Sequence, residues 1–155
     1  MKITMEFTMN QLQVTYDGFQ HCTALTQPQG KSVAMDCPNT GKGDEMSPAN
    51  LVGSGLAGCM LFSMGTLALR DRLDIIGTTV DVEVKQAHKR IHSIKLMFHM
   101  ARGYSKIDRV KLERAAGLCP VRSSFHPDTL ISVEYRYPQS NVQNDATRHG
   151  KPCST

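Results

Sequence analysis

The chain contains no tryptophan, and aromatic residues make up only 6% of its 155 residues. Its formal net charge is +4, but no run of basic residues is longer than Lys89-Arg90. Because nucleic-acid-binding proteins line phosphates with clustered basic side chains and stack bases on aromatic rings, these shortages argue against a nucleic-acid partner. The opening stretch, "MKITMEFTMNQLQ", has neither an apolar core segment nor a small-residue cleavage site. We therefore expect no secretory signal and a cytoplasmic protein.

Paired cysteine motifs are also missing. The five cysteines form no CxxC pair and do not combine with histidines at the spacing of a zinc site. Three histidines surround one predicted hairpin, but their spacing does not place them on one strand face; they are His88, His92 and His99. We expect no metal site, no bound cofactor and reduced thiols, as is usual in the cytoplasm.

The length fits one domain with its own core, which we place at residues 1–138. Residues 139–155 are polar and aperiodic, so we expect a disordered tail in which Cys153 has no structural context.

The N-terminal part of the sequence predicts three strands. Apolar residues alternate with polar ones, which predicts a half-buried strand; they are Met5, Phe7, Met9, Leu12, Val14 and Tyr16. A turn at Asp17-Gly18, a second run over 21–27, the Pro28-Gln29-Gly30 turn and a third run over 31–37 complete a meander. We attribute Cys22 and Cys37 to strand packing.

A long helix is expected from Ser47-Pro48, a favoured N-cap and first helical residue, to Arg70-Asp71-Arg72. It contains Gly53, Gly55 and Gly58 in the G-x-G-x-x-G pattern of dinucleotide-binding turns. That fingerprint needs a strand immediately before the glycines, whereas a polar loop and a helix start precede them here. We therefore reject a nucleotide site.

Residues 51–69 carry no charge, which is long enough to span a membrane. Four glycines and several hydroxyl side chains in this run favour a central helix buried in a soluble protein instead, and we expect no membrane partner. Each glycine costs about 1 kcal/mol in a helix, so we expect close approach of another element to compensate.

The second half of the chain predicts a hairpin over 80–100, a helix, a short helix and a last strand over 131–137. Ser105 and Asp108 have capping-box spacing, and Gly117 is suited to end the first of these helices. We expect its apolar residues to share a buried face: Ile107, Val110, Ala115 and Leu118. The element order is β-β-β-α-β-β-α-α-β, an α+β fold with mostly antiparallel strands around a long central helix.

Two cysteines are candidate site residues. Cys119 precedes Pro120, which places it at a predicted N-cap where free N–H groups favour a thiolate; a buried structural cysteine is the alternative. Cys59 lies on the long helix among small residues and is either a reactive thiol or a small core residue.

Taken together, "SPANLVGSGLAGC", the following hairpin and "GLCPV" resemble the OsmC/Ohr superfamily, which comprises osmotically inducible protein C and organic hydroperoxide resistance proteins. The resemblance extends over residues 10–138. It implies an OsmC-like fold and an intertwined homodimer with the long helices at its centre.

The resemblance also implies a thiol peroxidase that acts in oxidative-stress defence. Cys59 would attack an organic hydroperoxide and become a sulfenic acid, and Cys119 would then form a disulfide with it. A dithiol reductant, lipoyl-type or another thiol, would restore both cysteines.

Two departures from the family pattern leave an alternative open. Family peroxidases carry a Glu where this chain has Ala49, and an N-terminal Arg, whereas the first arginine here is Arg70. Lys31, His21 and Asn50 are candidate substitutes, and the sequence does not select among them. The alternative function is a catalytically weak or inactive relative that acts as a small-molecule-binding or redox-sensing dimer.

Overall fold

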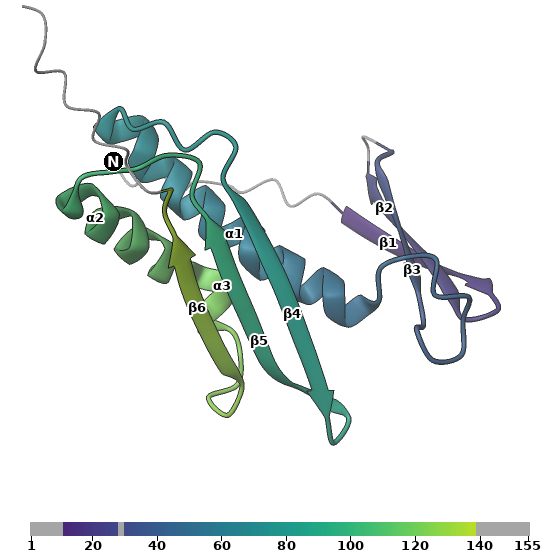
Figure 1. The fold of residues 1–155 in the computed structure, drawn as a ribbon. Coiled ribbons are helices and arrows are strands. Elements are labelled where there is room, and N and C mark those ends of the chain that lie inside the picture. The colour runs from purple at the N-terminus through teal and green to yellow at the C-terminus, as the bar shows by residue number, and fades with distance from the viewer. Residues whose placement is uncertain (1–10, 28–29, 139–155) are drawn as a thin grey trace, which may run out of the picture.

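The strands form two separate three-stranded sheets (Figure 1). The structure is a computed structural model and describes residues 11–27 and 30–138. The expected strand residues Met5, Phe7 and Met9, the expected tail 139–155 with Cys153, and most of the Pro28-Gln29-Gly30 turn lie outside the described residues. The element order within the described part is the predicted one.

The first sheet consists of β1 (Gln11–Gly18), β2 (His21–Gln27) and β3 (Ser32–Asp36), all antiparallel. It extends away from the start of the long helix (Figure 1). The alternation in β1 was expected to give a half-buried strand, but Leu12, Val14 and Tyr16 are more than half exposed. This expectation is wrong for the single chain because no described element covers that face of the sheet.

The long helix α1 (Pro48–Asp71) begins as predicted. The Ser47 hydroxyl accepts the Asn50 N–H at 3.1 Å, and Pro48 is the first helical residue. Gly53, Gly55 and Gly58 lie inside this helix, so they do not form a phosphate-binding turn. By length and composition α1 is the one described helix that meets the requirements of a membrane span, with 33% of its most apolar window buried.

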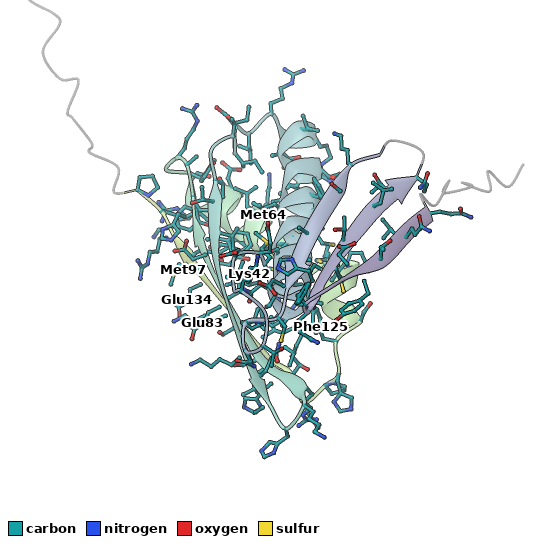
Figure 2. All side chains as sticks on the ribbon, turned by 90° about the vertical axis from the view of Figure 1, so that its right-hand side faces the viewer. Lys42, Met64, Glu83, Met97, Phe125 and Glu134 are labelled. Atoms are coloured by element: carbon teal, nitrogen blue, oxygen red, sulfur yellow. The ribbon has the colours of Figure 1, made fainter. Side chains whose placement is uncertain are left out.

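The second sheet carries the core. Its strands are β4 (Thr79–Ala87), β5 (Arg90–His99) and β6 (Leu130–Arg136), in the order β4-β5-β6. β4 and β5 form the predicted hairpin. β6 runs parallel to β5 because two helices, α2 (Lys106–Gly117) and α3 (Pro120–Ser123), return the chain across the same face. Glu83 and Glu134 lie on the opposite, solvated face, where Lys95 pairs with Glu134 at 3.1 Å (Figure 2).

The inner face of this sheet packs against one side of α1. The core consists of apolar residues from α1, β5, α2 and the residue before α3: Leu56, Ala57, Met60, Met64, Ala68, Ile94, Leu96, Phe98, Met100, Leu112, Ala116 and Cys119. Burial of this apolar surface is the main source of stability for the domain.

The helix α2 (Lys106–Gly117) is capped by Ser105 as predicted, since its hydroxyl accepts the Asp108 N–H at 3.1 Å. The expected buried face is wrong. Leu112 and Ala116 face α1, while three of the four residues assigned to the buried face are exposed: Ile107, Val110 and Leu118. The helix has apolar residues on more than one side, and the direction from which α1 approaches decides which side is covered.

The helical glycines differ in their surroundings. A Cβ at Gly53 would lie 2.6 Å from Val84 Cγ2 and 2.9 Å from Val82 Cγ1, so this glycine allows β4 to approach α1 closely. Gly55, Gly58 and Gly65 have no neighbouring atom within 4 Å of their Cβ positions. The close approach expected from the sequence is therefore present at one position and absent at the other three within the described single chain.

Candidate functional site

The structure brings Cys59 and Cys119 into contact. Cys59 lies in the middle of α1 and is partly buried, while Cys119 is the fully buried N-cap residue of α3 (Pro120–Ser123), which packs against α1. Cys59 packs against the core cluster that contains Cys119, and the two thiols are near enough for Cys59 to affect the ionisation of Cys119. Met64 on α1 and Phe125, just after α3, contribute to the same core (Figure 2).

Cys119 is the N-cap residue of α3, as predicted, but burial outweighs the effect of this position on its thiol. Burial raises the pKa of the Cys119 thiol above its ordinary value, and the adjacent Cys59 thiol raises it further. The Arg122 and Val121 backbone N–H groups act in the opposite direction, but Cys119 makes no well-formed capping hydrogen bond and the helix is only four residues long. Cys119 is therefore held as a neutral thiol next to Cys59.

Within the described single chain, none of the three substitutes that the sequence left open forms a hydrogen bond or ion pair with these thiols. Among the described residues, His21 pairs with Asp36 at 3.4 Å, and Lys31 is exposed next to β3. Asn50 uses its backbone N–H to cap α1. No hydrogen bond or ion pair from a basic side chain reaches Cys59 or Cys119 in residues 11–27 and 30–138.

Ala49, where the family resemblance would place a glutamate, lies in the first turn of α1. Since a helix rises about 1.5 Å per residue, this position is about 15 Å from Cys59 along the axis. Ala49 is buried and lines a partly open cavity of about 400 Å³ between the start of α1 and the first sheet. Neither Cys59 nor Cys119 lines this cavity.

The arrangement of the two thiols is suited to disulfide chemistry. Cys119 lies beside Cys59, and a thiol beside an oxidised sulfur can form a disulfide with it before further oxidation takes place. Within the part of the chain that the structure describes, no group of metal-binding side chains is present.

The surroundings of Cys37 differ from the strand packing that was predicted for it. Cys37 lies one residue beyond β3, in a turn, and its sulfur accepts a hydrogen bond from the Thr40 hydroxyl at 3.1 Å. The sequence "CPNTG" contains a signal for this environment. Proline, asparagine and glycine after the cysteine indicate a turn, and such a turn directs backbone N–H groups toward the cysteine sulfur.

Comparison with known proteins identifies the fold and the relatives. The family model for OsmC-like proteins matches residues 41–134. A solved structure from Psychrobacter arcticus 273-4, provisionally named as an osmotic stress induced and detoxification response protein, shares 30% sequence identity. The similarity covers 83% of this chain and 96% of that one, with a TM-score of 0.79.

Two more distant structures share the fold. An OsmC-like protein from Mycoplasma pneumoniae has 14% identity and a TM-score of 0.73, over 84% of this chain and 98% of that one. The organic hydroperoxide resistance protein OhrB of Bacillus subtilis has 16% identity and a TM-score of 0.60, over 81% and 98%. No curated protein matches the chain.

Proposed function

The chain belongs to the family of OsmC-like proteins, and from this premise we propose that it is a thiol-dependent peroxidase that reduces organic hydroperoxides in defence against oxidative stress. The observation that carries the proposal is the contact between the Cys59 and Cys119 thiols, which come from different helices. The organic hydroperoxide resistance protein of Bacillus subtilis shares this fold and supports the choice of substrate.

The first step takes place at Cys59, the more accessible of the two sulfurs. Its thiolate attacks the distal oxygen of the hydroperoxide, the O–O bond breaks, and the alcohol leaves with a proton from solvent. Cys59 is oxidised to a sulfenic acid in this step. The hydroperoxide receives the electron pair.

The second step uses the buried partner. The Cys119 sulfur attacks the sulfenic sulfur of Cys59, and water is lost as the disulfide forms. A dithiol reductant then exchanges with this disulfide, which leaves two thiols on the protein and an oxidised cyclic disulfide on the reductant. A lipoyl-type dithiol fits this step because one molecule supplies both electrons.

We also propose a cytoplasmic homodimer. The side of α1 that faces away from the second sheet carries the uncovered glycines and exposed apolar side chains such as Phe62 and Leu69. The exposed apolar face of the first sheet needs a cover as well. A second copy, placed against these surfaces, supplies the close approach that the helical glycines require.

The test is consumption of cumene hydroperoxide by the purified, reduced protein with dihydrolipoamide as reductant. We expect catalytic consumption by the wild type and by Cys22→Ser, and none above the uncatalysed rate by Cys59→Ser. Cys22 is a matched control because it is also a partly buried cysteine but lies on β2, in the first sheet. Wild-type consumption no faster than that of Cys59→Ser contradicts the proposal.

A second candidate function rests on the residues around the α1 start. Ala49 replaces the acidic residue of family peroxidases and lines a cavity, and no described basic side chain contacts the thiols. A non-catalytic dimer that binds a small molecule or senses redox state fits these observations. It predicts stoichiometric oxidation of Cys59 at most, without turnover in the presence of excess dithiol.

A further inference from the structure

A second pair of cysteines faces one cavity at the end of the first sheet. Cys22 on β2 and Cys37 after β3 both line the cavity of about 400 Å³ that also includes Ala49. The two cysteines lie on the same face because Cys22 pairs with Met35, two residues before Cys37. Both are partly buried. This cavity is separate from the contact between Cys59 and Cys119 within the chain.

The Cys37 sulfur accepts a hydrogen bond from the turn that follows it. The Thr40 hydroxyl donates to Cys37 Sγ at 3.1 Å, and the Gly41 N–H donates to the Cys37 carbonyl at 2.8 Å, which closes a single turn. The Thr40 hydroxyl, followed by the Asn39 and Thr40 backbone N–H groups, lowers the pKa of the Cys37 thiol against the opposing effect of burial. Donors arranged in this way stabilise a thiolate.

The loop that presents Cys37 is held in place by Asp36. One carboxylate oxygen, Oδ2, accepts the backbone N–H groups of Gly43 at 2.5 Å and Asp44 at 3.3 Å. The backbone N–H of Asp36 donates to the Met46 carbonyl at 3.1 Å, so the loop closes on itself. Gly41 has no room for a side chain, because a Cβ there would overlap the Asp36 carboxylate. The donors are therefore preorganised around the sulfur.

Asp36 also gives the cavity its charge. It is the only charged residue among the described residues that line the cavity, and it is 1% exposed. Its Oδ1 has no hydrogen-bond partner, whereas Oδ2 is fully engaged by the loop and by His21 at 3.4 Å. Oδ1 lies against Gly41 and is covered from solvent, so Asp36 acts on a ligand in the cavity through its negative charge and not through a direct hydrogen bond.

We propose that Cys37 is a second nucleophilic thiol of this protein, which forms mixed disulfides with disulfides of small aminothiols held in this cavity. The thiolate of Cys37 attacks one sulfur of the incoming disulfide, a new S–S bond forms to Cys37, and the other sulfur leaves as a thiolate. The incoming disulfide is reduced, Cys37 is oxidised, and no further oxidant is needed. The amino group of the ligand lies toward Asp36.

The test uses tryptic peptides, since each of the five cysteines lies in a different one and Cys37 is alone in residues 32–42. The reduced full-length protein is treated with cystamine at about pH 6.5, where an ordinary thiol is almost entirely protonated. The rate of mixed-disulfide formation at Cys37 is measured by mass spectrometry. A synthetic peptide with the sequence of residues 32–42 serves as the unfolded reference. The same measurements are made with bis(2-hydroxyethyl) disulfide, which has no amino group.

We expect Cys37 in the folded protein to react at least about threefold faster than in the peptide, since a larger thiolate fraction outweighs its lower nucleophilicity. Thr40→Val should bring the rate toward that of the peptide, and Thr40→Ser, which keeps the hydroxyl, should not. The ratio of the rate with cystamine to the rate with bis(2-hydroxyethyl) disulfide should be at least about threefold larger in the protein than in the peptide. A peptide-like rate in the folded protein, or equal preferences in the two, overturns the proposal.

This experiment is independent of the peroxidase proposal. Cys37→Ser should abolish mixed-disulfide formation in peptide 32–42 and leave hydroperoxide consumption unchanged. Failure of peroxidase activity in the wild type therefore leaves the reaction at Cys37 intact, and failure at Cys37 leaves the Cys59 chemistry untouched.

Discussion

The buried thiol of Cys119 contacts the thiol of Cys59, although one begins the short helix α3 and the other lies in the middle of α1. Burial keeps Cys119 protonated, so it does not compete with Cys59 as a nucleophile. The structure thus gives the two sulfurs unequal surroundings. We assign them unequal roles, with Cys59 oxidised first and Cys119 second.

The first prediction concerns the Cys119→Ser variant. With no resolving thiol, the Cys59 sulfenic acid should accumulate after one equivalent of cumene hydroperoxide and should go on to sulfinic acid with excess oxidant. Trapping with dimedone followed by mass spectrometry of peptide 43–70 measures this species. The wild type, treated identically, should trap far less. Equal trapping in both proteins is evidence against Cys119 as the resolving residue.

The second prediction concerns the pH dependence of disulfide formation. Because the pKa of Cys119 is raised from its ordinary value of 9.0, its thiolate fraction should increase about tenfold per pH unit below that value. The rate at which the sulfenic acid disappears in the wild type should therefore rise steeply between about pH 6 and pH 8. Stopped-flow mixing with a sulfenic acid probe follows it. A flat profile over this range contradicts a buried, protonated resolving thiol.

The third prediction concerns packing at Gly53. Gly53→Ala places a methyl group against Val82 and Val84, which should cost about 1–3 kcal/mol of the free energy of unfolding despite the better helix propensity of alanine. Gly117→Ala is the control, since nothing lies within 4 Å of its Cβ position. Denaturant unfolding at one fixed protein concentration measures both. A Gly53→Ala protein as stable as the control contradicts the close approach of β4.

The fourth prediction concerns the uncovered side of α1. Phe62 is 79% exposed in the single chain, and we expect a partner to bury it in a homodimer. Phe62→Lys should raise the dimer dissociation constant by at least about tenfold. This factor corresponds to the binding free energy lost when one large apolar side chain is no longer buried. Sedimentation equilibrium measures the constant. Glu83→Lys, on the outer face of the second sheet, is the control. A wild-type protein that sediments as a monomer rules out this arrangement.

The fifth prediction concerns acid stability of the 37–47 loop. Burial tends to raise the pKa of Asp36, but the N–H groups of Gly43 and Asp44 and the nearby His21 outweigh it, so the pKa lies below its usual 3.8. Because the pKa of Asp36 is lower in the folded protein than in the unfolded chain, its ionised form stabilises the folded protein at pH values above the unfolded pKa. This contribution is lost as the pH falls through the folded pKa. Asp36→Asn should therefore lower stability at neutral pH and weaken its dependence on pH below about 3.8. Glu45→Gln, an exposed change in the same loop, should do neither. Thermal unfolding across this range measures the difference.

Local signals in the sequence were sufficient for most elements. The start of α1 follows from Ser47 and Pro48, and that of α2 from Ser105, because capping depends on only a few neighbouring residues. The direction of β6 did not follow, since an alternating strand has the same pattern in a parallel and an antiparallel pair. The buried face of α2 was mispredicted because only the approach of α1 distinguishes Leu112 from Ile107.

The site was predictable only in part. The positions of Cys59 and Cys119 drew attention in the sequence, but the raised pKa of Cys119 depends on burial by distant residues, which spacing alone does not reveal. The environment of Cys37 arises from the turn formed by the residues just after it. Its shared cavity with Cys22 and Asp36 depends on strand pairing and on the α1 start, so it required the fold.

The most direct test of the account is to treat the reduced protein with one equivalent of cumene hydroperoxide and map its disulfides by mass spectrometry. We predict a mass loss equal to the two thiol hydrogens and a single cross-linked species that joins peptide 43–70, which contains Cys59, to peptide 115–122, which contains Cys119. An unchanged mass, or a disulfide that leaves either cysteine free, would contradict it.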